Sequence, residues 1–149
     1  VIELFADAVP RTAENFRRLC LGDPSKGELS FKGCRFHKMI PHFIMVSGDF
    51  VNHDGSGGMS IYGPTFPDES FELFHVGPGI VTMVNNGPDT NSSQFAIVLD
   101  KAEWLDGRCV VVGKVTEGLD LLQKQALKHG TATGIPASEL YIGGCGENS

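Results

Sequence analysis

Side chains that commonly bind metals or act as nucleophiles are scattered along this chain without a familiar spacing. No two histidines stand four residues apart, the spacing that places a zinc-binding pair on one helix face. No C-x-x-C pair occurs among Cys20, Cys34, Cys109 and Cys145. We therefore expect no metal, no cofactor and buried, reduced thiols, which favour a cytoplasmic or nuclear location. His37 is expected to be a structural hydrogen-bonding residue, whereas His42, His53, His75 and His129 are expected to face solvent.

The elements that must position any site are short strands and two helices. An apolar stripe that follows Pro10 predicts a helix ending at Gly22, and a second amphipathic pattern predicts a helix from Gly118 to Gly130. Strands are expected at 1–5, twice within 31–50, and at 80–85, 94–99, 110–112 and 140–142, with loops at 23–30 and 54–58. The segment 94–99 is almost continuously apolar, which predicts burial on both sides. Many strands with two helices favour a mainly β barrel or sandwich.

Composition restricts the class of protein further. The chain has 149 residues, 41% of them hydrophobic and 20% charged, and a formal net charge of −6, so we expect one globular domain over 1–149. The acidic balance disfavours nucleic acid as a partner. No apolar run reaches the roughly 18 residues of a membrane span, so no membrane association is expected. The chain starts on a strand pattern without Met, and we expect it to be part of a longer protein, truncated at its N-terminal side.

The order of several motifs resembles the cyclophilins, the cyclosporin-binding peptidyl-prolyl isomerases. The resemblance spans nearly the entire chain. It begins with the segment from Pro10 to Phe16, which is similar to the first helix of the family. It continues through Phe36-His37-Lys38-Met39-Ile40-Pro41-His42-Phe43, Ser47-Gly48-Asp49-Phe50, Gly55-Ser56-Gly57-Gly58-Met59, Gly77-Pro78-Gly79-Ile80, Met83-Val84-Asn85, Asn91-Ser92-Ser93-Gln94-Phe95, Glu103-Trp104-Leu105-Asp106-Gly107 and Val111-Val112-Gly113-Lys114-Val115.

The resemblance implies a closed eight-stranded antiparallel β-barrel with an α-helix over each open end. It places Val1 within the second strand of the family, so that the first strand is missing from the given chain. A barrel without one strand presents open edges, which natural proteins avoid. We therefore expect a preceding segment or a neighbouring chain to fill that position.

The resemblance also implies a chemistry and a set of site residues. Cyclophilins accelerate cis/trans exchange at X-Pro bonds, which requires a hydrophobic seat for the proline ring and a hydrogen-bond donor near the prolyl nitrogen. Carried over by position, the catalytic residues are Lys38, Phe43, Asn85 and Gln94. The proline pocket and groove comprise His37, Ile44, Val46, Val84, Ala96, Trp104, Leu105 and Cys109.

Several of these positions depart from the family pattern. Lys38 replaces an Arg, Val46 a Gln and Ala96 a Phe; Ile44 and Cys109 likewise replace a Met and a His. An ammonium lacks the planar fork of Arg, and loss of an aromatic ring should loosen proline binding. Two functions stay open: an isomerase with a weakened active site that acts on proline-containing segments in protein folding or conformational switching, or an inactive scaffold subunit of a larger assembly. Cyclosporin is expected to bind weakly or not at all.

Simpler structural roles are also open for individual residues. Lys38 is an ordinary surface lysine in the simplest interpretation, but its place in the motif favours a position facing the pocket. Phe43 fits barrel packing as well as ligand contact. Trp104, the only Trp, would by default fill the core, whereas the resemblance places it at the groove rim. The loop 23–28 is a further candidate partner surface.

Overall fold

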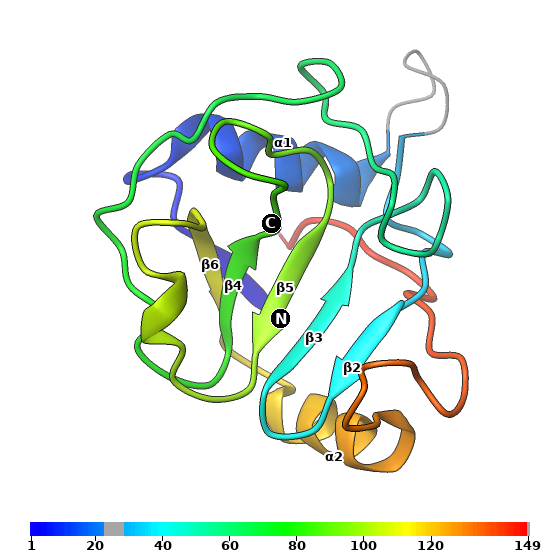
Figure 1. Cartoon of the computed structure of the whole chain (residues 1–149). Coiled ribbons are helices and arrows are strands. Elements are labelled where there is room, and N and C mark those ends of the chain that lie inside the picture. Colours follow the sequence, from blue (N-terminus) through cyan, green and yellow to red (C-terminus); the bar gives the residue numbers. More distant parts are fainter. Residues whose placement is uncertain (23–28, 149) are drawn as a thin grey trace.

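The computed structural model describes residues 1–22 and 29–148, and the predicted partner surface at 23–28 lies outside them. Figure 1 shows the two helices at opposite ends of the strands. The predicted helices and most predicted strands are confirmed. The chain order is β1 (Ile2–Leu4), α1 (Pro10–Leu21), β2 (Lys38–Ile40), β3 (Ile44–Ser47), β4 (Ile80–Met83), β5 (Phe95–Val98), the short 3₁₀ helix η2 (Glu103–Leu105), β6 (Val111–Val115) and α2 (Leu119–His129).

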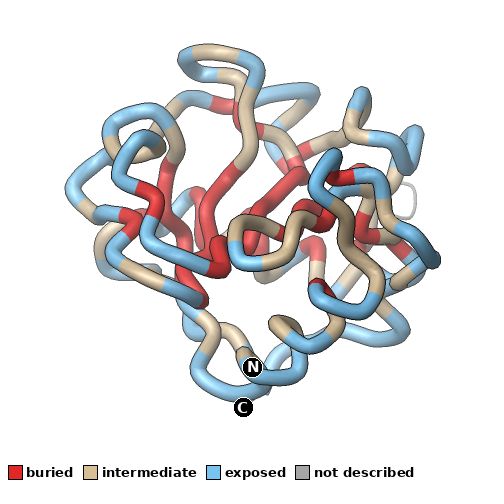
Figure 2. The backbone as a smooth tube through the Cα atoms, turned by 60° about the horizontal axis from the view of Figure 1, so that its bottom comes forward, coloured by how far each residue is buried: buried red, intermediate tan, exposed pale blue. Residues whose placement is uncertain are grey.

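The strands of the described residues form one six-stranded antiparallel sheet in the order β1-β6-β4-β5-β3-β2. Side chains alternate across it, so Phe95 and Ile97 of β5 lie on one face and Ala96 lies on the other. The face that carries Phe95 and Ile97, which we call the inner face, holds the larger core cluster. The opposite, outer face carries a smaller cluster of Ile80, Val98, Ala102 and Val111. Both faces of β5 are buried, as predicted, and Figure 2 shows burial concentrated along the central strands.

The inner face is packed with phenylalanine rings. Phe16 of α1 lies 5.0 Å from Phe31 and 5.1 Å from Phe95 between ring centroids, in tilted and edge-to-face arrangements. Phe31 also contacts Phe95 at 5.1 Å and Phe50 at 6.5 Å. Such tilted pairs add to the free energy gained by burying each ring. The cluster therefore attaches α1 to the sheet.

The N-terminus of α1 is held by a carboxylate from a distant loop. Val9 precedes the helix without a capping side chain. Glu69 instead accepts hydrogen bonds from the backbone N–H of Arg11 at 2.9 Å and from the N–H and hydroxyl of Thr12 at 2.8 Å each. A negative charge at this end also interacts favourably with the helix dipole. Glu69 thus connects the irregular segment after residue 63 to the helix.

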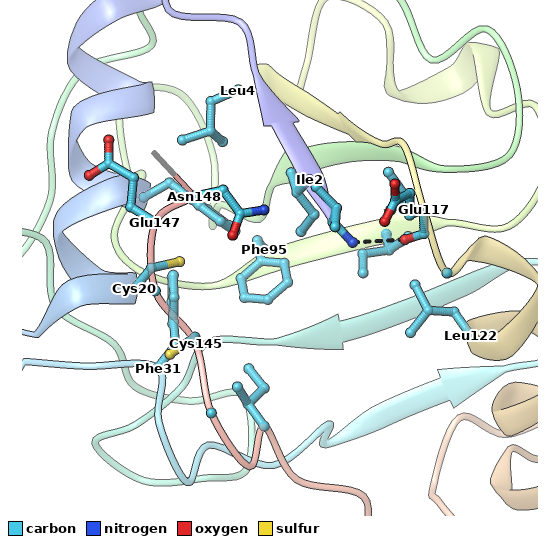
Figure 3. A pocket seen from close by; sticks show the side chains of 18 of the residues that line it. Ile2, Leu4, Cys20, Phe31, Phe95, Glu117, Leu122, Cys145, Glu147 and Asn148 are labelled. Carbon is cyan, nitrogen blue, oxygen red and sulfur yellow. Dashed lines mark hydrogen bonds between the residues drawn. The ribbon is translucent and has the colours of Figure 1, made fainter.

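The sheet does not close within the described residues, so the eight-stranded barrel is not observed. The N–H of Thr116 donates to Val1 O and that of Phe5 donates to Val112 O, at 2.8 Å each. By the antiparallel alternation, the backbone groups of Ile2 and Leu4 point away from β6. Beside this edge lies an apolar cavity of about 600 Å³ between β1 and the C-terminal segment (Figure 3).

The opposite wall of that cavity is the segment in which the last strand was predicted. The prediction of a strand at 140–142 is wrong for the described residues, because Tyr141 forms only an isolated bridge with Arg35. Two backbone hydrogen bonds of 2.8 Å flank the bridge, from Phe36 N–H to Leu140 O and from Ile142 N–H to Cys34 O. Their alternation turns the backbone of Tyr141 toward the open side. Regular strand pairing therefore stops at Tyr141, on the side where a further strand would have to lie.

Neither helix of the described residues has both the length and the apolarity required to cross a membrane.

Candidate functional site

Strand register places three predicted site residues in one line on the outer face. Lys38 of β2 lies opposite Val46 of β3, Val46 lies opposite Ala96 of β5, and Ala96 lies opposite Thr82 of β4. Directly opposed residues share a face with Cβ atoms about 4.5–5.5 Å apart. We call these four residues the outer row. Thr82 was not predicted, because hydrophobic alternation gives the face of a residue but not its partner on another strand.

Lys38 forms the exposed end of the outer row. Its stem lies against Gly134, where an added Cβ atom would stand 3.0 Å from Lys38 Cγ and 3.2 Å from Cε. Among the described residues its ammonium has neither a hydrogen-bond partner nor an ion-pair partner. It is therefore a free cationic donor on a flexible stem, without the fixed direction that a guanidinium provides.

The middle of the outer row is closed to solvent. Val46 is 6% exposed and Ala96 only 1%. Neither side chain offers a hydrogen-bond donor. A ligand ring could reach Ala96 only if neighbouring side chains moved, so among the described residues there is no open seat at the position where the family pattern has an aromatic ring.

Two aromatic residues lie together beside the row. Phe43 follows the turn between β2 and β3, where its N–H donates to Ile40 O at 3.1 Å and its carbonyl accepts from Leu99 N–H at 2.8 Å. Its ring centroid is 5.8 Å from that of Trp104 on η2. Trp104 is 58% exposed, so it is not a core residue. The predicted groove residues Ile44 and Leu105 pack beneath, against the smaller core cluster.

Gln94 serves the glycine-rich loop at 54–58. Its Nε2 donates to Gly55 O at 2.8 Å and to Gly57 O at 2.7 Å. Both amide protons are thereby used within the protein. Gln94 is thus placed to hold the loop rather than to donate to a peptide.

The same loop is organised by Asp49. One carboxylate oxygen accepts from the N–H groups of Val51 and Asn52, and the other from those of Asp54, Gly55 and Gly57, at 2.9–3.2 Å. Burial alone would raise the pKa of this carboxyl, but these hydrogen bonds outweigh it and hold the pKa far below its usual range.

His37 packs against this loop. A Cβ on Gly55 would stand 3.0 Å from His37 Cδ2, and the buried Nδ1 has no partner among the described residues. Burial lowers the pKa of His37, so the ring is neutral at pH 7. The ring therefore packs against the loop, and its Nδ1 does not make the structural hydrogen bond that was expected of this residue.

The remaining predicted residues lie where β4 ends. Asn85 Nδ2 donates to Arg108 O at 2.8 Å and lies 3.9 Å from Cys109 Sγ. Val84 is half-buried, and its N–H donates to Gln94 O at 3.0 Å. Burial raises the pKa of the Cys109 thiol, which keeps it protonated and a poor nucleophile.

Two expectations about titratable residues are wrong. His75 does not face solvent: it is 0% exposed and lies between Asp106 and Thr82. Cys145 is exposed rather than buried. Within the described ranges, no three His, Cys, Asp or Glu side chains gather as a metal site. The apolar cavity lies on the inner face, across the sheet from the outer row.

Comparison with protein families agrees with this arrangement. Residues 1–147 match the family model of the cyclophilin type peptidyl-prolyl cis-trans isomerases. The match covers almost the whole chain, and the chain therefore belongs to this family, whose members act on proline-containing peptides.

Proposed function

We propose that this member of the cyclophilin family binds proline-containing polypeptide segments over the outer row and accelerates X-Pro isomerisation weakly. The observation that carries the proposal is the line from Lys38 through Val46 to Ala96, with the Phe43–Trp104 pair beside it. This line puts a cationic donor, an apolar floor and an aromatic wall on one face. The floor and the wall would hold a proline ring, and the donor would approach the prolyl nitrogen.

The reaction sets the demand on these residues. Rotation about the X-Pro bond is opposed by about 18–20 kcal/mol, because resonance makes the C–N bond partly double. A hydrogen bond to the prolyl nitrogen favours the pyramidal form in which resonance is lost, and each tenfold in rate requires about 1.4 kcal/mol of such preferential stabilisation. The Lys38 ammonium, which has no partner among the described residues, is a donor available on this face. No bond other than the hydrogen bond is made or broken.

The same geometry supports low activity. Lys38 swings on a four-carbon stem, so part of each hydrogen bond formed is offset by lost side-chain freedom. Val46, its direct neighbour, has no donor to fix the carbonyl before the proline. Ala96 is buried, so the proline ring has to displace neighbouring side chains to seat fully.

Exchange spectroscopy on a short peptide with an Ala-Pro bond tests the proposal. We expect slight acceleration by the protein, loss of it in Lys38→Ala, and about tenfold faster exchange in Lys38→Arg, because a fixed guanidinium donor is worth on the order of 1.4 kcal/mol. Lys114→Ala is the matched control, since Lys114 is an exposed strand lysine on β6. No acceleration at high protein concentration, together with no gain in Lys38→Arg, would exclude catalysis.

A second candidate is a binding subunit without catalysis within a larger assembly. The closed middle of the outer row favours it, because Val46 and Ala96 provide neither a donor nor an open seat. In that case the Ala-Pro peptide would still bind and perturb Trp104, while exchange at its proline would proceed at the uncatalysed rate in every variant.

We also propose that an additional extended segment, placed between β1 and the bridge at Tyr141, closes the sheet into a barrel, in which the six strands, that segment and residues 140–142 make eight. The outward backbone groups of Ile2 and Leu4 on one side and of Tyr141 on the other support this, as does the apolar cavity between them. The segment would present apolar side chains at alternate positions toward Phe95 and Leu122, which Figure 3 shows bordering the cavity.

A further inference from the structure

A hydrogen-bonded chain centred on the fully buried His75 lies beneath the outer face, outside the predicted site. Asp106 Oδ1 accepts from the backbone N–H of His75 at 2.7 Å and lies 2.8 Å from His75 Nδ1. At the other side of the ring, Nε2 lies 2.9 Å from Thr82 Oγ1. Because an ionised carboxylate can only accept, Nδ1 carries the proton that faces Asp106. Both ring nitrogens are therefore partnered.

His75 fixes both ends of the turn that carries the aromatic wall. Its carbonyl accepts from the N–H of Ala102, the residue before η2, at 3.1 Å. Its N–H and ring both bind Asp106, the residue after η2. Trp104 and Leu105 lie between these two attachments. The hydrogen bonds of one buried residue thus set where the wall stands.

The far end of the same ring reaches the groove floor. Thr82 is the fourth member of the outer row and lies directly opposite Ala96. Its hydroxyl is also 3.2 Å from Val110 O, so its single proton is shared between two acceptors within reach, Val110 O and His75 Nε2. The His75 ring tolerates little movement, since each of its buried nitrogens would lose the one partner it has if the ring shifted.

We infer that His75 is a positioning residue, which sets the distance between the groove wall at Trp104 and the groove floor at Ala96. This inference rests on the proposed function, in which that groove holds the proline-containing segment. His75 touches no substrate. It acts through Asp106 on the wall and through Thr82 on the floor.

A matched pair of variants at Thr82 tests the hydrogen-bonded chain from Asp106 through His75 to Thr82. Thr82→Val keeps the shape of the side chain but leaves Nε2 without a partner, whereas Thr82→Ser keeps the hydroxyl. His75→Phe keeps a ring of similar size and removes the two ring contacts, to Asp106 and to Thr82, while the backbone hydrogen bonds to Ala102 and Asp106 remain. Leu19→Ala is the control for general destabilisation, because Leu19 is equally buried but lies in the inner-face cluster.

Two measurements separate positioning from stability. Trp104 is the only Trp, so its emission reports the wall directly, and the dissociation constant of the Ala-Pro peptide reports the groove. We expect Thr82→Val and His75→Phe to shift the Trp104 emission and to raise the dissociation constant of the peptide about tenfold, which is the effect of one lost buried hydrogen bond. We expect Thr82→Ser to stay near wild type, and Leu19→Ala to lower the melting temperature without moving either readout.

The outcomes distinguish this inference from the proposed function. If no variant, including wild type, binds the peptide, the proposed function fails, while the emission shift still decides the positioning role. Unchanged emission in folded Thr82→Val overturns the inference, as does an equal shift in Leu19→Ala. If His75→Phe does not fold, the comparison of Thr82→Val with Thr82→Ser decides alone.

Discussion

Replacing Asp49 by Asn should loosen the glycine-rich loop that Gln94 supports. An amide has one acceptor oxygen, so its NH₂ group must face either the N–H groups of Val51 and Asn52 or the three that bind the other carboxylate oxygen. At least two donors of partly buried hydrogen bonds then lose their acceptor. At about 1–3 kcal/mol for each, we expect Asp49→Asn to lower the free energy of unfolding by roughly 2–6 kcal/mol.

Urea titration measures that loss, with Asp54→Asn as the control. Asp54 is exposed in the same loop, and within the described part of the chain its side chain accepts hydrogen bonds from Ser56 through one oxygen, which an amide retains. The control should stay within about 0.5 kcal/mol of wild type. Amide exchange should accelerate at Gly55 and Gly57 in Asp49→Asn only. A loss no larger than that of the control would show that the five amides do not depend on the Asp49 charge.

The pH dependence provides a second check on the same residue. The pKa of Asp49 is lower in the folded than in the unfolded protein, so its contribution is fully present above the unfolded value of about 3.9 and declines as the pH falls below it. Below about pH 4, the free energy of unfolding of wild type should therefore fall more steeply with decreasing pH than that of Asp49→Asn. Parallel acid limbs for the two proteins would refute the assignment.

Two further predictions concern the cavity edge and the drug site. In the chain of residues 1–149, the backbone amides of Ile2 and Leu4 should exchange with solvent faster than that of Glu3. Of these three amides, that of Glu3 alone points toward β6. Equal protection of the three would contradict the open edge. Cyclosporin should bind poorly, because the floor at Ala96 is closed and lacks an aromatic ring. Titration followed by Trp104 emission tests this, and saturation below about 1 μM would contradict it.

The fold was predictable wherever the relevant contacts are local in sequence. The apolar stripe of Pro10–Leu21 and the continuous apolarity before Leu99 depend on neighbouring residues alone, and both appear as expected. Residues 140–142 also have a strand-like pattern. A strand needs a partner as well as a pattern, and the segment has one on one side only.

The site divides in the same way. The motif around Lys38 predicted which residues share the outer face, but not that Ala96 would be closed or that Thr82 would lie opposite it. His75 was misassigned because its partner Asp106 is 31 residues away, and its neighbours Phe74 and Val76 give no sign of that pairing. Long-range polar pairing leaves no periodic signal in a single sequence.

Three of the five departures from the family pattern are neighbours, and this affects how they act. Lys38, Val46 and Ala96 occupy adjacent places in one row, each directly opposite the next. Residues in direct contact are not energetically independent, so the effect of one depends on the side chain beside it. A guanidinium at position 38 would lie beside Val46, whose side chain offers it no acceptor. An aromatic ring at position 96 would need space that Val46 and Thr82 border. The altered row is therefore best regarded as one coupled change to the groove, whose floor remains attached through Thr82 and His75 to its wall.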